Sequence, residues 1–245
     1  MIIDCDASYG RGAVALPREI ETVTDLLAEL DHSGIDKALV WHRDAWERDF
    51  DLGNQRVAEL RGHPRLYPTM TFVPTCCEEM PSAEGFLRRM QAIGADSVRA
   101  FPARHCFCLD RLSCGDLLDL FCAHSIPVLV PFPEMPGGWQ GVYQLMRDFP
   151  TLPLVLTETG CWGQDRYFRP LMKAYPRFYI TTNRLETAGQ LESIVNVVGP
   201  DHLLFGSGLP RNYPGGYILM LQRANISDDA RDANAHGNFE RIQLL

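Results

Sequence analysis

The stretch MIIDCDASYG (residues 1–10) begins with apolar side chains and runs directly into polar ones. Alternation along a β-strand places Asp4, Asp6 and Ser8 on one face. The pattern predicts a first buried strand whose carboxyl end carries polar groups. If Asp6 faces the interior of the sheet structure, all three side chains are expected to face it.

Seven further apolar runs follow this first strand at regular intervals. They are continuous rather than alternating, as strands covered on both faces are. The eight predicted strands span residues 2–5, 38–41, 66–72, 97–101, 127–130, 154–157, 178–182 and 203–206.

Helical patterns separate the predicted strands. One begins at Thr22 and stops at Gly34, a typical start and stop pair. The others cover 52–64, 82–94, 110–125, 139–150, 167–176, 191–200 and a last stretch from about 227. Strands alternating with helices imply a parallel sheet, and eight such units in 245 residues have the size of an α/β (β/α)8 TIM barrel. An open doubly wound sheet is the alternative, but it requires a glycine-rich phosphate loop that residues 6–14 fit poorly.

Composition bounds the class of protein. The chain is 46% hydrophobic and has a net charge of −8, which argues against a nucleic-acid partner. No apolar run approaches the roughly 20 residues that span a bilayer, so no membrane partner is expected. We expect one barrel domain over residues 1–245, in the cytoplasm, with a homo-oligomer left open.

Five segments match a known family in order and spacing: residues 1–10, 26–41, 149–160, 201–210 and 235–242. Through them the chain resembles the amidohydrolase-related family of TIM-barrel metal hydrolases and decarboxylases. The resemblance implies a divalent metal held by histidines after strands 1, 5 and 6 and by an aspartate after strand 8. The corresponding positions in this chain are Asp6, Ser8, Pro131, Glu158 and Gly208.

These five positions make a poor metal site. Proline and glycine offer no side-chain ligand, serine is a weak one, and a catalytic metal needs about three protein ligands. We therefore expect a divergent member with a degenerate metal site and no cofactor. The family-based alternative is a divalent metal, zinc or similar, held by Asp6 and Glu158 or by substituted ligands.

Asp6 and Glu158 are the predicted catalytic pair. Two carboxyl groups held at different protonation states can serve as acid and base. The alternative for Glu158 is a salt bridge to an arginine. Asp4 is expected to be a structural acceptor for backbone or hydroxyl groups. His42 and His105 follow strands 2 and 4 and are the predicted auxiliary catalytic residues.

Five more residues near strand ends are predicted to bind substrate: Ser8, Trp41, Arg99, Arg184 and Arg211. Arginine can hold a carboxylate through two parallel hydrogen bonds, and tryptophan lines pockets for apolar ligands.

The absence of side chains at Gly206 and Gly208 predicts a cavity near strand 8. We expect its lining to include Asp6 and Glu158, with at least one of three further residues, which are His42, His105 and Arg99.

Cysteines are predicted to gather on one rim of the barrel. Those near the strand ends are Cys5, Cys76, Cys77, Cys106, Cys108 and Cys161. Their spacings are not those of known zinc folds. We expect free thiols, without disulfides and without a bound metal.

The hypothesis from the sequence is an enzyme, a hydrolase or lyase. It would act on a small carboxylic or amide substrate by acid/base chemistry, without the usual catalytic metal. The alternatives are a non-catalytic barrel that binds a small molecule, and a metallohydrolase with substituted ligands.

Overall fold

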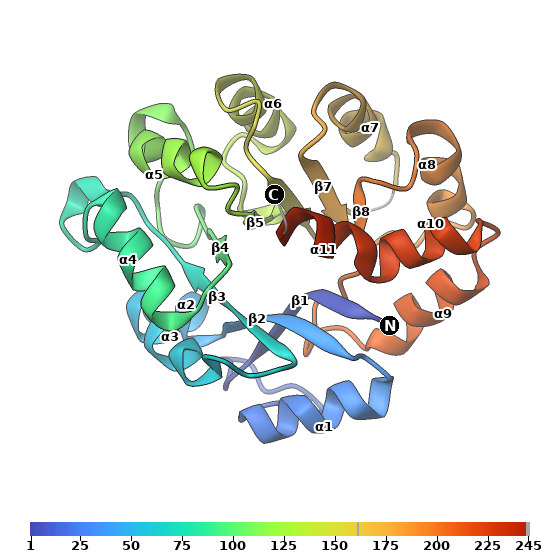
Figure 1. Ribbon diagram of the computed structural model, residues 1–245, viewed down its shortest axis with the longest axis horizontal. Coiled ribbons are helices and arrows are strands. Elements are labelled where there is room, and N and C mark those ends of the chain that lie inside the picture. The colour runs from blue at the N-terminus through green and yellow to red at the C-terminus, as the bar shows by residue number, and fades with distance from the viewer. Residues whose placement is uncertain (161, 244–245) are drawn as a thin grey trace.

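Eight parallel strands form the barrel predicted from the sequence. The computed structural model describes residues 1–160 and 162–243, and Figure 1 shows the strands surrounded by helices. The strands are β1 (Ile3–Tyr9), β2 (Lys37–His42), β3 (Leu66–Thr71), β4 (Ser97–Arg99), β5 (Val128–Pro131), β6 (Leu154–Thr157), β7 (Phe178–Thr181) and β8 (Leu203–Leu204). They pair in the order β1 to β8. The segment after β8 returns to β1, where the Cys5 and Ser8 N–H groups donate to the carbonyls of Phe205 and Leu209, at 2.8 and 2.9 Å.

Helices follow the strands as the spacing predicts. They are α1 (Val23–Ser33), α2 (Asp44–Glu47), α3 (Phe50–Val57), α4 (Ala83–Ile93), α5 (Arg111–Ala123), α6 (Gly138–Asp148), α7 (Asp165–Ala174), α8 (Gln190–Val198), α9 (Pro214–Arg223), α10 (Asp228–Asp232) and α11 (Asn238–Gln243). Thr22 caps α1 and Gly34 ends it in the left-handed conformation, as expected. In the part of the chain that the structure describes, no helix has the length and apolar character needed to cross a membrane.

Helix α9 was not predicted from the sequence. Two glycines, Gly215 and Gly216, follow Pro214 in its first turn and weaken the helical pattern. Proline fits the first turn because its missing N–H has no partner there, and Ile218 and Leu221 are buried against the barrel. Packing therefore decides this helix more than propensity does.

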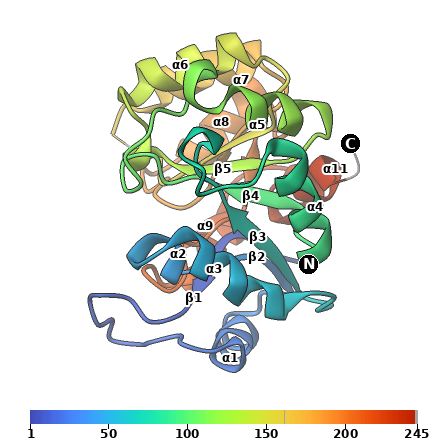
Figure 2. The same ribbon diagram turned by 90° about the vertical axis from the view of Figure 1, so that its left-hand side faces the viewer.

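One end of the barrel is filled with apolar side chains. Inward-facing residues form a cluster of Ile3, Cys5, Leu39, Leu129, Val155, Tyr179 and Leu204, and Phe239 and Ile242 of α11 complete it. Figures 1 and 2 show α11 lying across this end, near the N-terminus. Because apolar side chains fill this end, the polar groups gather at the opposite end, where the carboxyl ends of the strands lie, as in other TIM barrels.

The expectation that Asp4, Asp6 and Ser8 share one face is wrong for Asp4. The pairing of β1 with β2 shifts register between Asp4 and Ala7, which interrupts the strict alternation. Cys5 lies in the interior cluster, and the Asp4 carboxylate instead accepts hydrogen bonds from the backbone of Asp6 and from Ser207. Asp4 is thus the structural acceptor that the sequence suggested.

Candidate functional site

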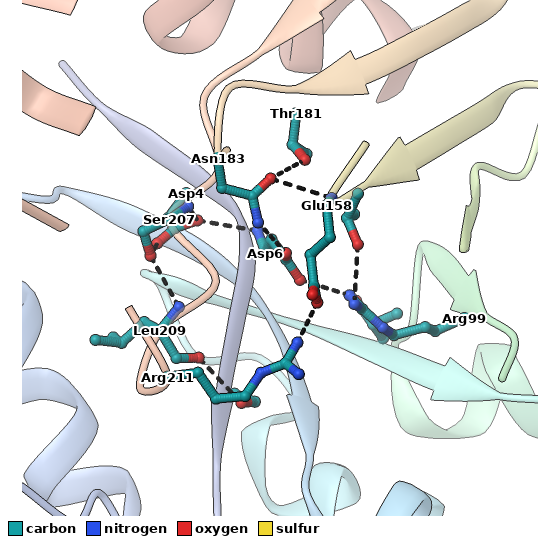
Figure 3. A network of polar contacts seen from close by, with 12 residues as sticks. Asp4, Asp6, Arg99, Glu158, Thr181, Asn183, Ser207, Leu209 and Arg211 are labelled. Carbon is teal, nitrogen blue, oxygen red and sulfur yellow. Dashed lines mark hydrogen bonds and ion pairs between the residues drawn. The ribbon is translucent and has the colours of Figure 1, made fainter. Parts of the chain in front are cut away.

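The deepest polar group of the barrel mouth is an ion pair between Asp6 of β1 and Arg99 at the end of β4. One Asp6 oxygen accepts from Arg99 Nη1 at 2.7 Å and the other from Asn183 Nδ2 at 2.9 Å. The Asp6 and Arg99 side chains are 3% and 1% exposed. Figure 3 shows Asp6, Arg99 and Asn183 together at the barrel mouth. Arg99 Nη2 also donates to the Thr157 hydroxyl at 3.3 Å, and the guanidinium lies over the ring of Trp41. Both Asp6 oxygens are therefore occupied, and its charge is neutralised within the barrel.

Glu158 follows β6 and has a different environment. The backbone of Glu158 is in the left-handed conformation, with φ of 58°. Residues other than glycine rarely adopt this conformation, and those that do are often found at functional sites. The Glu158 carboxylate pairs with Arg211, whose side chain is 53% exposed, whereas that of Glu158 is 8% exposed (Figure 3). Burial raises the pKa of Glu158, the nearby charge of Asp6 adds to this, and Arg211 opposes both. A carboxyl with a raised pKa can donate or accept a proton near neutral pH.

A pocket opens above these groups at the carboxyl ends of the strands. It encloses about 540 Å³ of empty space, its open mouth included, and Glu158 and Arg211 line one side of it. Trp41, Trp46 and Phe101 provide aromatic walls. The remaining lining residues are Ser8, Arg43, Glu47, Pro131, Pro133 and Glu134. Glu47 is paired with Arg43, and Glu134 accepts from the Trp46 indole. The charged groups left for a ligand are therefore the buried Glu158 carboxyl and the accessible Arg211 guanidinium, an arrangement that suits a small flat anion.

The pocket differs from the predicted one in its lining. Glu158 lines it as expected, but Asp6, Arg99 and the two histidines do not. The predicted cavity at the two strand 8 glycines is also wrong, because side chains fill that space. A Cβ at Gly206 would lie 2.8 Å from Thr181, and one at Gly208 would lie 2.6 Å from Asn212.

His42 lies on the outer face of the sheet. Its neighbour Trp41 lines the pocket, so alternation along β2 turns the imidazole toward the helices. His42 Nδ1 accepts from the Asp44 N–H at 3.1 Å, and the ring packs edge-on against Tyr9. Burial lowers the pKa of His42. The structure does not bring this residue together with Glu158.

His105 lies beside the mouth, outside the residues that line the pocket. Its Nε2 bonds to the Ala45 carbonyl at 2.9 Å, and its ring packs edge-on against Phe101. Burial lowers the pKa of His105. It supports the aromatic wall that Phe101 provides.

The other predicted binding residues are divided between the pocket and its surroundings. Ser8 lines the pocket but its hydroxyl donates to the Leu209 carbonyl at 3.0 Å. Arg184 is exposed after β7 and lowers the pKa of Glu158 by less than Arg211 does. Arg211 is thus the predicted arginine that the structure places beside both the catalytic candidate and the pocket.

The cysteines remain separate thiols among the described residues. The Sγ atoms of Cys76 and Cys77 are 3.9 Å apart and are not bonded. Cys106 and Cys108 are exposed and Cys5 is buried, and all three are free. Cys161 lies outside the described residues.

Asn183 is the site residue that sequence reasoning missed. It follows β7, donates to Asp6, and its Oδ1 accepts from the Glu158 N–H at 3.4 Å and from the Thr181 hydroxyl. Its amide thereby connects the two carboxyl-bearing residues of the mouth. The signal was present, because Thr181, Thr182 and Asn183 form a polar run directly after an apolar strand.

The residues at the implied metal positions do not fit a metal. Asp6 is paired with Arg99, Glu158 with Arg211, and the Ser8 hydroxyl donates to a carbonyl. Pro131 and Gly208 have no ligating atom in their side chains. Within residues 1–160 and 162–243, no three histidine, cysteine or acidic side chains converge as a metal site would require.

Comparison with known proteins supports the fold. No protein-family model matches the sequence, and no curated protein does either. Solved structures do match over nearly the whole chain. An uncharacterised TIM-barrel protein from Bordetella bronchiseptica is 18% identical, with a TM-score of 0.75 over 99% of this chain and 98% of that one. The chain has the fold of this barrel.

Two enzymes share the same fold. A 5-carboxyvanillate decarboxylase from Novosphingobium aromaticivorans, complexed with manganese and a nitrobenzoic acid, is 12% identical, with a TM-score of 0.76 over 100% of this chain and 96% of that one. A 4-oxalomesaconate hydratase from Rhodopseudomonas palustris is 14% identical, with a TM-score of 0.71 over 100% and 96%. The resemblance seen in the sequence therefore extends to the fold.

Proposed function

We propose that the protein is an enzyme that performs acid/base chemistry on a small carboxylate with a flat, unsaturated or aromatic body. The observation that carries the proposal is Glu158, a buried carboxyl with a raised pKa that lies beside the accessible guanidinium of Arg211. The reaction class is a hydrolysis or a lyase reaction in which Glu158 transfers the proton. The names of the two structurally similar enzymes also point to carboxylic acids.

Substrate binding would itself prepare Glu158 for catalysis. A substrate carboxylate that forms two hydrogen bonds with Arg211 takes this arginine from Glu158. Glu158 then loses the cation that most opposes the effect of burial on its pKa. The carboxyl becomes more readily protonated when substrate is present, which is the state that a general acid requires.

Arg99 supplies the positive charge at the base of the site. Its guanidinium is paired with the Asp6 carboxylate, which is the strongest potential metal ligand left at the implied metal positions. This guanidinium balances the charge of Asp6 below the pocket, and it lowers the pKa of Glu158 by less than the Asp6 carboxylate raises it. In this proposal Asp6 holds Arg99 in position, and proton transfer is assigned to Glu158.

Trp41, Trp46 and Phe101 define the shape of the substrate. Their rings leave a narrow pocket in which a planar body packs well. Trp46 is fixed by its Nε1, which donates to Glu134 at 3.0 Å, and the backbone of Arg104 donates to the other Glu134 oxygen at 2.8 Å. A preformed wall of this kind selects for flat molecules over branched aliphatic ones.

The test is a thermal-shift screen of small aromatic and unsaturated carboxylates and amides, followed by turnover assays on every compound that binds. We expect binders among the carboxylates and turnover of at least one. Glu158→Gln should bind the same compounds within about threefold but lose about 100-fold or more in turnover, the usual contribution of a general acid. Glu79→Gln, at an exposed glutamate outside the pocket, is the control.

Other outcomes identify the alternatives. Binding without turnover of any compound would indicate a non-catalytic small-molecule-binding barrel. Turnover that is unchanged in Glu158→Gln, or that needs an added divalent metal, would contradict the proposed role of Glu158 and favour a metallohydrolase with substituted ligands.

A further inference from the structure

A second hollow lies beside the pocket and shares a wall with it. This groove runs between the segment from Leu185 to Leu191 and helix α9, and it holds about 1330 Å³ of empty space open to solvent. Arg211 lines both hollows. The ion pair between Arg211 and Glu158 therefore lies where the pocket and the groove meet.

Gln190 gives the groove unused hydrogen-bonding capacity. The residue lines the groove and is 7% exposed. Its Oε1 is buried and accepts no hydrogen bond from any described residue. A buried polar group without a partner destabilises the fold, so a group that persists in this state marks a place where a ligand can supply the missing partner.

The first turn of α8 adds backbone donors at the same place. Gly189 is the N-cap residue before α8 and has no side chain to cap it, and the Gln190 N–H donates to the Thr187 carbonyl at 3.0 Å. The N–H groups of Leu191 and Glu192 belong to the same first turn, and N–H groups in this position have no hydrogen-bond acceptor within the helix. The groove thus presents backbone donors next to the Gln190 carboxamide.

We propose that this groove binds an amide-bearing arm of the substrate whose carboxylate end occupies the aromatic pocket, an inference that rests on the proposed function. An amide brings one acceptor and one donor. Its carbonyl can accept from the first turn of α8, and its N–H can donate to Gln190. The amide N–H supplies the donor that Gln190 Oε1 lacks, whereas an ester or a carboxylate has no such donor.

Apolar groups complete the match. Leu185, Met220 and Ala224 line the groove between the polar groups, so a short aliphatic chain can pack beside the amide. Arg211 would contact the substrate where the two parts join. The substrate class is therefore a carboxylate with an unsaturated head and an amide-bearing arm.

The experiment compares three probes by calorimetry: benzoate, benzoates with an amide arm of increasing length, and the matching esters. We expect the best amide probe to bind about tenfold more tightly than its ester, from one or two net hydrogen bonds. Gln190→Leu should abolish this difference and leave benzoate binding unchanged. Gln140→Leu, the same substitution at an exposed glutamine on α6, should leave the difference intact.

A filling variant gives an independent readout. Met220→Trp narrows the groove and should weaken every armed probe while leaving benzoate unaffected. Equal affinity of amides and esters in the wild-type protein, or an amide preference that survives Gln190→Leu, would overturn the inference. Failure of the proposed function is distinguishable, because benzoate would then fail to bind, or would bind equally well to Arg211→Met, whatever the arm does.

Discussion

Asp6 and Glu158 lie in the same barrel mouth but have different partners, and this difference separates their roles. Asp6 is buried with Arg99 and Asn183 on its two oxygens, so it has no free position for a substrate. Glu158 has a half-exposed partner that an incoming carboxylate can take. Sequence alone assigned both carboxyl groups to proton transfer because it could not show which of them Arg99 occupies.

Removing Arg99 should be strongly destabilising. Arg99→Met leaves Asp6 buried without its cation, and breaking a buried ion pair in this way costs about 3–5 kcal/mol of unfolding free energy. Urea unfolding measures the loss. The double variant Arg99→Met with Asp6→Asn should recover part of it, because the buried charge is gone. A loss under about 1 kcal/mol in the single variant would contradict the role given to the pair.

The pKa of Glu158 should respond to Arg211. Burial raises this pKa and Arg211 lowers it, so removing the cation in Arg211→Met should move the titration of Glu158 to higher pH. Carbon-detected NMR of the side-chain carboxyl measures the midpoint without any substrate. Arg184→Met is the matched control and should cause a smaller shift, since Arg184 lowers the pKa of Glu158 by less than Arg211 does. An unchanged midpoint in Arg211→Met would mean that the ion pair does not control Glu158.

At the scale of elements, the contact between β1 and the segment after β8 holds the mouth together. The Asp4 carboxylate accepts hydrogen bonds from the Asp6 N–H and from both the N–H and the hydroxyl of Ser207. The Gly208 N–H donates to the Asp6 carbonyl at 2.9 Å. β8 itself has only two residues, so these contacts extend the closure beyond the regular strand.

Asp4 should make stability depend on pH. Burial raises the pKa of Asp4 from 3.8 to about 6, so the folded state binds its proton more tightly than the unfolded chain does. The tighter proton binding stabilises the folded state by about 3 kcal/mol. This stabilisation is fully present below about pH 4 and is lost as the pH rises through about 6. Chemical unfolding of the wild type and of Asp4→Asn across pH 4 to 8 measures it. The stability of the wild type relative to the variant should fall over this range, and a constant difference would contradict the prediction.

At the scale of the whole molecule, the strand and helix pattern sufficed for the barrel, because apolar runs and helix caps are local signals. The cap at Thr22 and the stop at Gly34 lie where the sequence places them. The site was less accessible to prediction. Whether His42 faces the axis or the helices depends on alternation along β2, which turns Trp41 inward instead.

Pairing across the barrel could not be predicted from the sequence. Asp6 and Arg99 lie 93 residues apart, and Asp6 and Asn183 lie 177 apart. Such contacts depend on strand register, and a single shift, the one between Asp4 and Ala7, already changed which side chains face the mouth. The metal positions could be assigned through the resemblance, but the arginine that occupies Asp6 appears only in three dimensions.

Metal analysis of the purified protein tests the central claim most directly, namely that a guanidinium and a buried carboxyl provide the chemistry at this barrel mouth. The protein is prepared without chelator and analysed by plasma mass spectrometry, together with Asp6→Asn and Glu158→Gln. We expect well below one equivalent of zinc, manganese or iron in all three, with no change between them. About one equivalent in the wild type that is lost in either variant would contradict the claim.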